Sequence, residues 1–117
     1  MKKLTYIILV LLMAAATPVK GQSPCGSDGL CAVQFNAGFN EANKVTWIDK
    51  LNDCDKHYID ISVDASAAGK YKIVVVPTII VFNGKEVKRF QADISFAMKA
   101  TKSEVQEVVD EILMDQF

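Results

Sequence analysis

Several residue types are scarce in this sequence, and each shortage excludes a class of protein. The 117 residues include only three prolines, and half of all residues are apolar, which argues against a disordered chain. The lone histidine, His57, offers no paired spacing for a zinc site. Internal repeats and low-complexity tracts are also missing. We therefore expect one globular domain with neither a metal nor a cofactor.

The one long apolar run lies at the N-terminus and is short for a membrane span. Lys2 and Lys3 precede an apolar stretch over residues 4–16, which is typical of a secretory signal peptide. We expect residues 1–21 to be removed, although cleavage could also follow Ala16. An uncleaved N-terminal anchor is the alternative. The mature protein would be exported, periplasmic or secreted, and free of the membrane.

The segment expected to be removed carries Lys2, Lys3 and Lys20. Its loss leaves ten basic residues against fourteen acidic ones, a net charge of about −4. No basic patch remains that could neutralise a row of phosphates, so nucleic acid is not an expected partner. The remaining chain divides into a flexible segment over residues 22–30 and a domain over residues 31–117.

Four segments of that domain carry strand patterns. Residues 59–63 alternate apolar and polar side chains, which is the period of a half-buried strand. Asn83-Gly84 is a tight turn suited to joining two antiparallel strands. The expected strands cover residues 31–36, 59–63, 79–82 and 86–91.

Apolar spacing predicts the helices. Val45, Ile48 and Leu51 recur three residues apart, so we expect a helix through them. Residues 105–113 have the spacing of an amphipathic helix. Thr101 and Ser103 each begin a candidate capping box at its start. The order of elements is then βαβαββα.

Two segments resemble the thioredoxin-like superfamily. Residues 69–78, Gly-Lys-Tyr-Lys-Ile-Val-Val-Val-Pro-Thr, are similar to that family's Lys-Tyr-x-Ile-x-x-(Ile/Val)-Pro-Thr signature. Residues 35–44 resemble the strand end and helix start that carry the family's Cys-x-x-Cys pair. The resemblance covers residues 31–115. It implies an α/β thioredoxin-like fold, in which helices flank a mixed four-stranded sheet of order 2-1-3-4.

The chain departs from the family's pattern where the dithiol should be. Asn40 and Asn43, in Asn-Glu-Ala-Asn, stand at the two cysteine positions, and Gln34 matches the place of a buried acid that relays a proton. A carboxamide forms no thiolate and carries no titratable proton, so thioredoxin-type redox catalysis is not expected. The two asparagines either only begin the helix, with Asn40 as its N-cap, or contact a ligand.

The resemblance also implies a groove for an extended peptide. Val76-Pro77 is similar to the family's cis-proline dipeptide, whose backbone binds such a peptide. Ala92 stands where the family usually has a glycine facing the same groove. Alternatively, Pro77 only shapes the core. The implied binding residues are Phe39, Asn40, Asn43, Val76, Pro77, Gln91 and Ala92.

The pairing of the three cysteines stays open at this point. In an oxidising compartment two would pair and one would remain. Cys25 can close a glycine-containing loop onto Cys31, or Cys31 can pair with Cys54, which is expected at the same end of the domain. We expect all three at the end opposite the asparagines, in structural or incidental roles, with an intermolecular crosslink or a redox function as alternatives.

These features predict an exported thioredoxin-like domain that binds a protein or peptide without catalysis. The partner would lie in the cis-proline groove or along the strand at residues 59–63. That strand is expected at a sheet edge, because residues 22–30 are too rich in turn formers to pair with it. We expect a monomer. The alternative is a thiol-disulfide oxidoreductase, or an accessory of oxidative folding, that uses the remaining cysteines.

Overall fold

The structure is a computed structural model that describes residues 24–25 and 29–116. The expected signal peptide at residues 1–21 lies outside the described residues, as does most of the segment at 22–30. Among the described helices, none is long and apolar enough to cross a membrane. The elements are β1 (Leu30–Asn36), the 3-10 helices η2 (Gly38–Asn43) and η3 (Trp47–Lys50), β2 (Asp55–Asp60), α2 (Ala65–Lys70), β3 (Thr78–Asn83), β4 (Glu86–Gln91) and α3 (Lys102–Asp115).

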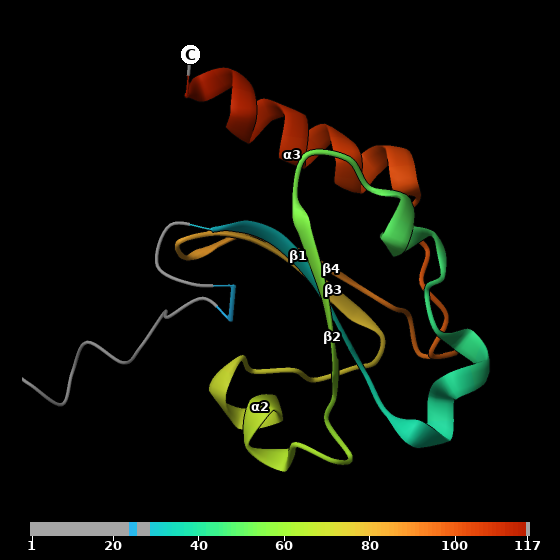
Figure 1. Ribbon diagram of the computed structural model, residues 1–117. Helices are drawn as coiled ribbons and strands as arrows, with labels where there is room; N and C mark the ends of the chain where they lie inside the picture. The colour runs from blue at the N-terminus through green and yellow to red at the C-terminus, as the bar shows by residue number, and fades with distance from the viewer. Residues whose placement is uncertain (1–23, 26–28, 117) are drawn as a thin grey trace, which may run out of the picture.

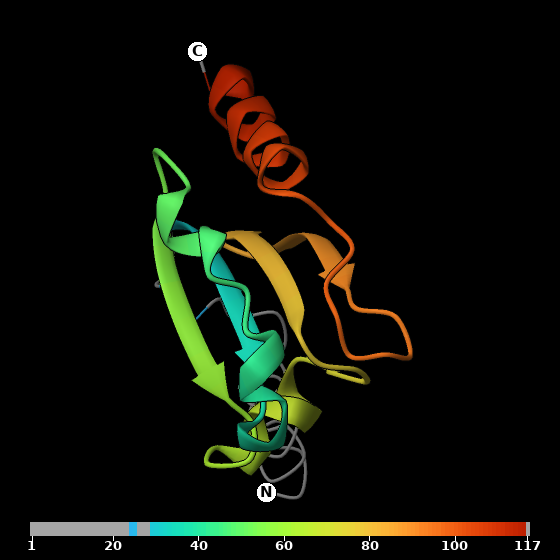
Figure 2. The same ribbon diagram turned by 90° about the vertical axis from the view of Figure 1, so that its right-hand side faces the viewer.

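The four strands form one mixed sheet in the order β2-β1-β3-β4, which confirms the expected fold class. β1 runs parallel to β2 and antiparallel to β3, and β4 is antiparallel to β3. Figure 2 shows β2 and β4 at the two edges. β1 is buried from its second residue onward because it has a strand on each side and packing on both faces, which explains its nearly continuous apolar sequence.

Helices cover both faces of this sheet, with α3 and α2 on opposite sides (Figure 1). Alternate residues of each strand point to opposite faces, so one strand supplies both layers. Ala32 belongs to the core beneath α3, where it joins Val105 and Val109 of that helix. Val33 belongs to the core on the side of α2, which includes Tyr71 just after that helix.

The first helix is replaced by η2 and η3, so the α-helix expected through Val45, Ile48 and Leu51 is wrong. Only Ile48 of the three lies in a helix, η3, but all three side chains still reach the core. Gln34 bonds both backbone groups of Val45. Its Nε2 donates to the Val45 carbonyl at 2.9 Å, and its Oε1 accepts from the Val45 N–H at 2.7 Å. A continuous helix would need those groups for itself.

The second strand lies earlier than expected, since β2 covers Asp55–Asp60 and not residues 59–63. The Asp60 carboxylate accepts hydrogen bonds from the backbone N–H and the hydroxyl of Ser62. The Asp60 carbonyl accepts from the N–H groups of Val63 and Asp64. These bonds form a turn that ends the strand. Val63, expected on the buried face, is 84% exposed.

The C-terminal half follows the sequence expectations closely. Gly84 and Lys85 link β3 to β4, one residue later than the expected Asn83-Gly84 turn, and Gly84 has φ 82°, a conformation that glycine adopts without steric cost. α3 begins at the first of the two candidate capping boxes. Thr101 Oγ1 accepts from the Glu104 N–H at 3.3 Å, while the Glu104 carboxylate accepts from the Thr101 N–H at 3.0 Å.

Candidate functional site

Three segments that are distant in sequence meet at the end of the sheet where β1 finishes. η2 follows β1 directly, and the cis peptide bond Val76–Pro77 immediately precedes β3. The Pro77 carbonyl accepts a hydrogen bond from the Ala92 N–H at 3.0 Å, just after β4. Val76, Pro77 and Ala92 are all buried. The site is therefore built on the ends of the strands and not on a free loop.

A network of three asparagine side chains joins these segments. Asn36 Oδ1 accepts from Asn40 Nδ2 at 3.1 Å, and Asn36 Nδ2 donates to the Asn40 carbonyl at 3.1 Å. Asn40 Oδ1 accepts from Asn43 Nδ2 at 2.9 Å. Asn40 Nδ2 also lies 3.0 Å from the Phe96 carbonyl and 3.4 Å from the Val76 carbonyl. It has two hydrogens for three acceptors, so the longest contact, with Val76, is the weakest.

The expected role of Asn40 as a helix N-cap is wrong. Asn40 lies inside η2, whose N-cap is Ala37, and no side chain bonds the backbone there. Its side chain is 5% exposed and makes tertiary hydrogen bonds instead. Asn43 is exposed and touches the network only through Asn40. The buried amide thus connects η2 to β1 and to the loop after β4.

Two exposed phenylalanines lie beside the asparagine network. Phe39 is 75% exposed and Phe96 is 41% exposed, and their rings meet edge to face with centroids 5.7 Å apart. Phe96 has φ 63°, a left-handed conformation that costs a bulky residue on the order of 1–3 kcal/mol. Its N–H donates to the Asp93 carbonyl and its carbonyl accepts from Asn40, so both sides of the residue are held.

The neighbouring loops carry two more exposed apolar side chains. Val74, in the loop before the cis peptide bond, is 80% exposed, and Ile94, in the loop after β4, is 97% exposed. Exposed apolar side chains that cluster on loops around one end of a fold mark interaction surfaces more often than scattered ones do. We refer to Phe39, Val74, Ile94 and Phe96 as the apolar rim.

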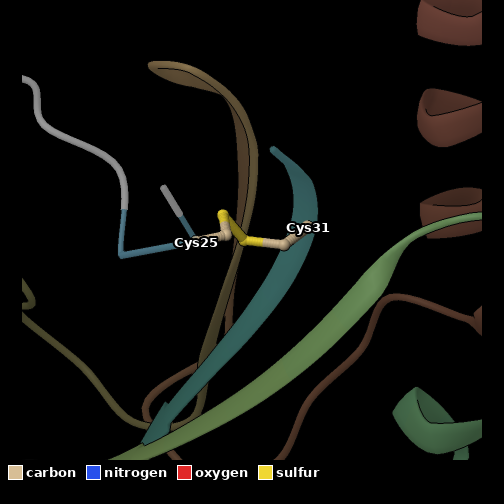
Figure 3. The surroundings of a disulfide bond; sticks show 2 residues. All are labelled: Cys25 and Cys31. Carbon is tan, nitrogen blue, oxygen red and sulfur yellow. A yellow bond between two sulfur atoms is a disulfide. The ribbon is translucent and has the colours of Figure 1, made fainter. Parts of the chain in front are cut away.

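The cysteines lie at the other end of the sheet. Cys25 and Cys31 form a disulfide with their Cα atoms 6.1 Å apart (Figure 3). Cys31 stands near the start of β1 and Asn36 at its end, a separation of roughly 16 Å at about 3.3 Å per residue. The disulfide is therefore remote from the cis peptide bond.

Cys54 remains a free thiol, and the alternative pairing of Cys31 with Cys54 is wrong. The register places Asp55 opposite Cys31, so Cys54, one residue earlier, turns to the other face of the sheet. Cys31 accordingly packs on the side of α2, and Cys54 on the side of α3. Burial raises the pKa of the Cys54 thiol, an effect that the nearby Lys56 ammonium opposes.

Two other positions that the sequence singled out, Gln34 and Gln91, lie outside the asparagine network. Gln34 is fully buried, and both ends of its amide bond Val45. Gln91 is exposed and ends β4, opposite Thr78. In residues 24–25 and 29–116, no three His, Cys, Asp or Glu side chains are grouped so that they could hold a metal ion.

Thioredoxins of known structure share this architecture. Thioredoxin 1 from Thermosipho africanus is 23% identical with a TM-score of 0.55, and the match covers 74% of this chain and 97% of that one. A mutant thioredoxin from Halobacterium salinarum is 14% identical with a TM-score of 0.58, over 80% of this chain and 91% of that one. Fasciola hepatica thioredoxin is 24% identical with a TM-score of 0.51, over 86% and 89%. The chain has a thioredoxin-like fold.

At these identities the similarity shows the fold alone. No family model matches the sequence, and no curated protein matches it. Of the implied binding residues on η2, Asn40 contacts the Val76 carbonyl at 3.4 Å, whereas Phe39 contacts Phe96 and Asn43 contacts Asn40. Asn36 and Phe96 were not anticipated. Asn36 could have been identified from the sequence, because it is an asparagine at the end of a largely apolar strand. The left-handed backbone of Phe96 could not, because phenylalanine has no preference for that conformation.

Proposed function

We propose that this thioredoxin-like chain binds an extended polypeptide at the cis-proline loop and exchanges no thiols there. In this proposal Asn40 and Asn43 stand in place of a Cys-x-x-Cys pair. The observation that carries the proposal is the Asn40 amide, which holds Phe96 beside Phe39 at the surface. A side-chain amide offers no nucleophile for catalysis. We therefore assign the hydrogen bonds of Asn40 a structural role, in which they hold the surface in shape.

The energetics favour a partner with apolar side chains. Burying one exposed phenylalanine contributes about 1.5–3 kcal/mol, and the two rings already contact each other. The left-handed conformation of Phe96 lowers the stability of the isolated chain. A residue kept at such a cost, and still 41% exposed, is better explained by a contact that the isolated chain lacks than by packing.

Binding to a peptide array tests this proposal. The tightest-binding unstructured peptide from the array would be labelled, and its affinity measured by fluorescence anisotropy. Phe39→Ala and Phe96→Gly should each weaken binding about tenfold, the equivalent of about 1.4 kcal/mol. Met114→Ala removes an equally exposed apolar side chain from α3 and serves as the control. An array without a binder, or unchanged affinity in both phenylalanine variants, would exclude the proposal.

Thiol-disulfide exchange at Cys25–Cys31 is a second candidate, and the disulfide itself is its support. This is a more direct observation than any that favours peptide binding. A partner's thiolate would attack Cys25 Sγ, since Cys31 is fully buried, and Cys31 would leave as a thiolate. The partner's second thiol would then resolve the mixed disulfide, so that the partner is oxidised and both cysteines are reduced.

Insulin reduction in the presence of dithiothreitol separates the two candidates. Peptide binding alone predicts no turnover above that of dithiothreitol. Thiol exchange predicts turnover that Cys25→Ser and Cys31→Ser abolish and that Cys54→Ser retains, because Cys54 lies on the other face of the sheet. Both candidates suit an exported protein, which we propose from the pattern of residues 1–21 and from cysteine pairing.

A further inference from the structure

A cavity of about 260 Å³ opens between β2 and the segment that joins η2 to η3. It lies where the chain leaves helical geometry, at Lys44, Val45 and Thr46, which all line it. Gln34 anchors this segment through Val45, so the wall of the cavity is fixed to β1. The cavity is separate from the cis-proline loop, so a ligand bound in it would be independent of the proposed function.

Two lysine side chains line this cavity. Lys56 and Tyr58 pair with Ala32 and Gln34 across the sheet, so both face the side on which η3 lies. The Lys56 ammonium donates to the Leu51 carbonyl at 2.8 Å, which fixes its position and leaves it two more N–H donors.

The second lysine sits above an aromatic ring. Lys44 Nζ lies 4.4 Å from the centroid of the Tyr58 ring, a cation–π contact that holds the ammonium near the cavity. Neither Lys44 nor Lys56 forms an ion pair within the described part of the chain. Both charges are thus available to an external anion.

The rest of the lining determines which anion fits. Val45 and Ile48 are buried and apolar, and the Tyr58 ring adds a third apolar surface. Asp49 is the only carboxylate among the lining residues, and the Glu41 carboxylate, which accepts from the Tyr58 hydroxyl at 3.5 Å, lies just outside them. His57 also lines the cavity, but its pairing with Val33 turns its side chain to the opposite face.

We infer that this cavity binds a small organic carboxylate. The carboxylate lies between the Lys44 and Lys56 ammonium groups, where charge-assisted hydrogen bonds are about twice as strong as neutral ones. A short apolar body lies against Val45, Ile48 and Tyr58. The volume, just below that of drug-sized sites, limits the ligand to a small organic molecule.

An NMR titration with sodium valerate tests the inference, with valeramide as the uncharged match. Valerate should shift the amides of residues 44–49 and 56–58 saturably, and valeramide should bind at least about tenfold more weakly. Lys44→Gln and Lys56→Gln should each weaken valerate binding about tenfold. Lys50→Gln removes an exposed lysine of η3 that does not line the cavity, and it should leave the affinity unchanged within about twofold.

Four results would overturn the inference. They are an absence of saturable shifts, equal binding of valeramide, an effect of Lys50→Gln as large as that of Lys44→Gln, and tighter binding of inorganic phosphate than of valerate. Because Lys56 also bonds Leu51, its variant is compared by thermal unfolding before titration. The exposed Lys44 provides the decisive variant if Lys56→Gln is destabilised.

Discussion

A single side chain, that of Asn40, bonds to the end of β1, to the loop after β4 and to its own helix. The bond with Asn36 is buried, and the bonds with the Phe96 carbonyl and with Asn43 are partly buried. Removing one partner from a buried hydrogen bond costs more than the bond itself contributes, because the other partner stays desolvated. Asn40 therefore supports the conformation of Phe96 as well as the local fold.

We expect Asn40→Ala to lower the free energy of unfolding by about 1–3 kcal/mol, because Asn36 Oδ1 and the Phe96 carbonyl lose their donor. Urea denaturation measures the change. The matched control is Asn43→Ala, in which an exposed amide loses one bond and the expected loss is below about 1 kcal/mol. Equal losses of unfolding free energy in the two variants would show that the buried Asn40 amide contributes no more to stability than the exposed Asn43 amide does.

Cys54 allows a prediction of pH dependence. Burial raises the folded-state pKa of its thiol above that of an unfolded chain. The thiolate fraction at pH 8 is then lower in the folded protein, so alkylation by iodoacetamide should be slower than in denaturant and should accelerate as pH rises. The stability linked to this thiol is present below the unfolded pKa and is lost as pH rises toward the folded pKa. Equal alkylation rates with and without denaturant would contradict this.

Among the elements, those set by local chemistry were predictable from the sequence. Thr101 and Glu104 define the start of α3, and Gly84 lies in the turn between β3 and β4. The first helix was not predictable, because Gln34, eleven residues before Val45, determines how the chain runs there. A bond across such a separation depends on the finished fold and leaves no periodic pattern in the sequence.

The same distinction applies to the candidate site. The sequence resemblance named Asn40, Val76 and Pro77 together, whereas the network that connects them depends on Asn36 and on the backbone of Phe96. The end of β2 was also missed, because the Asp60 side chain caps a turn with Ser62 that overrides the alternating pattern. Side-chain to backbone bonds of this kind compete with strand pairing.

β2 is an edge strand whose outer backbone groups we propose to be open to water or to an added strand. In hydrogen exchange monitored by NMR, amides of β2 that face β1 should exchange slowly and the alternate ones quickly, while β1 is protected throughout. Uniform protection of β2, especially if it depends on protein concentration, would mean that a second chain covers the edge and that the expected monomer is wrong.

In the molecule as a whole, β1 connects two chemically different ends. Its first half carries the disulfide to Cys25, and its last residue joins the asparagine network. The two ends are separated by the most buried part of the sheet. Changes at one end should therefore reach the other only through the stability of the entire fold.

Reduction of the disulfide tests this separation. The bond closes a loop of sequence separation 6, so in the chain-entropy estimate its reduction lowers the free energy of unfolding by about 2 kcal/mol. Urea denaturation with and without reductant measures that loss. Amide chemical shifts of residues 36–43 should stay unchanged in the reduced protein. Large shifts there would show that the cysteine end communicates with the cis-proline end.

The asparagine network has a consequence for how the protein responds to its surroundings. A dithiol changes charge with pH and covalent state with the redox conditions, whereas carboxamides do neither. Asn36, Asn40 and Asn43 thus keep the same donors and acceptors in oxidising, reducing, acidic or neutral surroundings, for as long as the fold persists. These three amides therefore give the proposed binding surface neither a pH-dependent nor a redox-dependent switch.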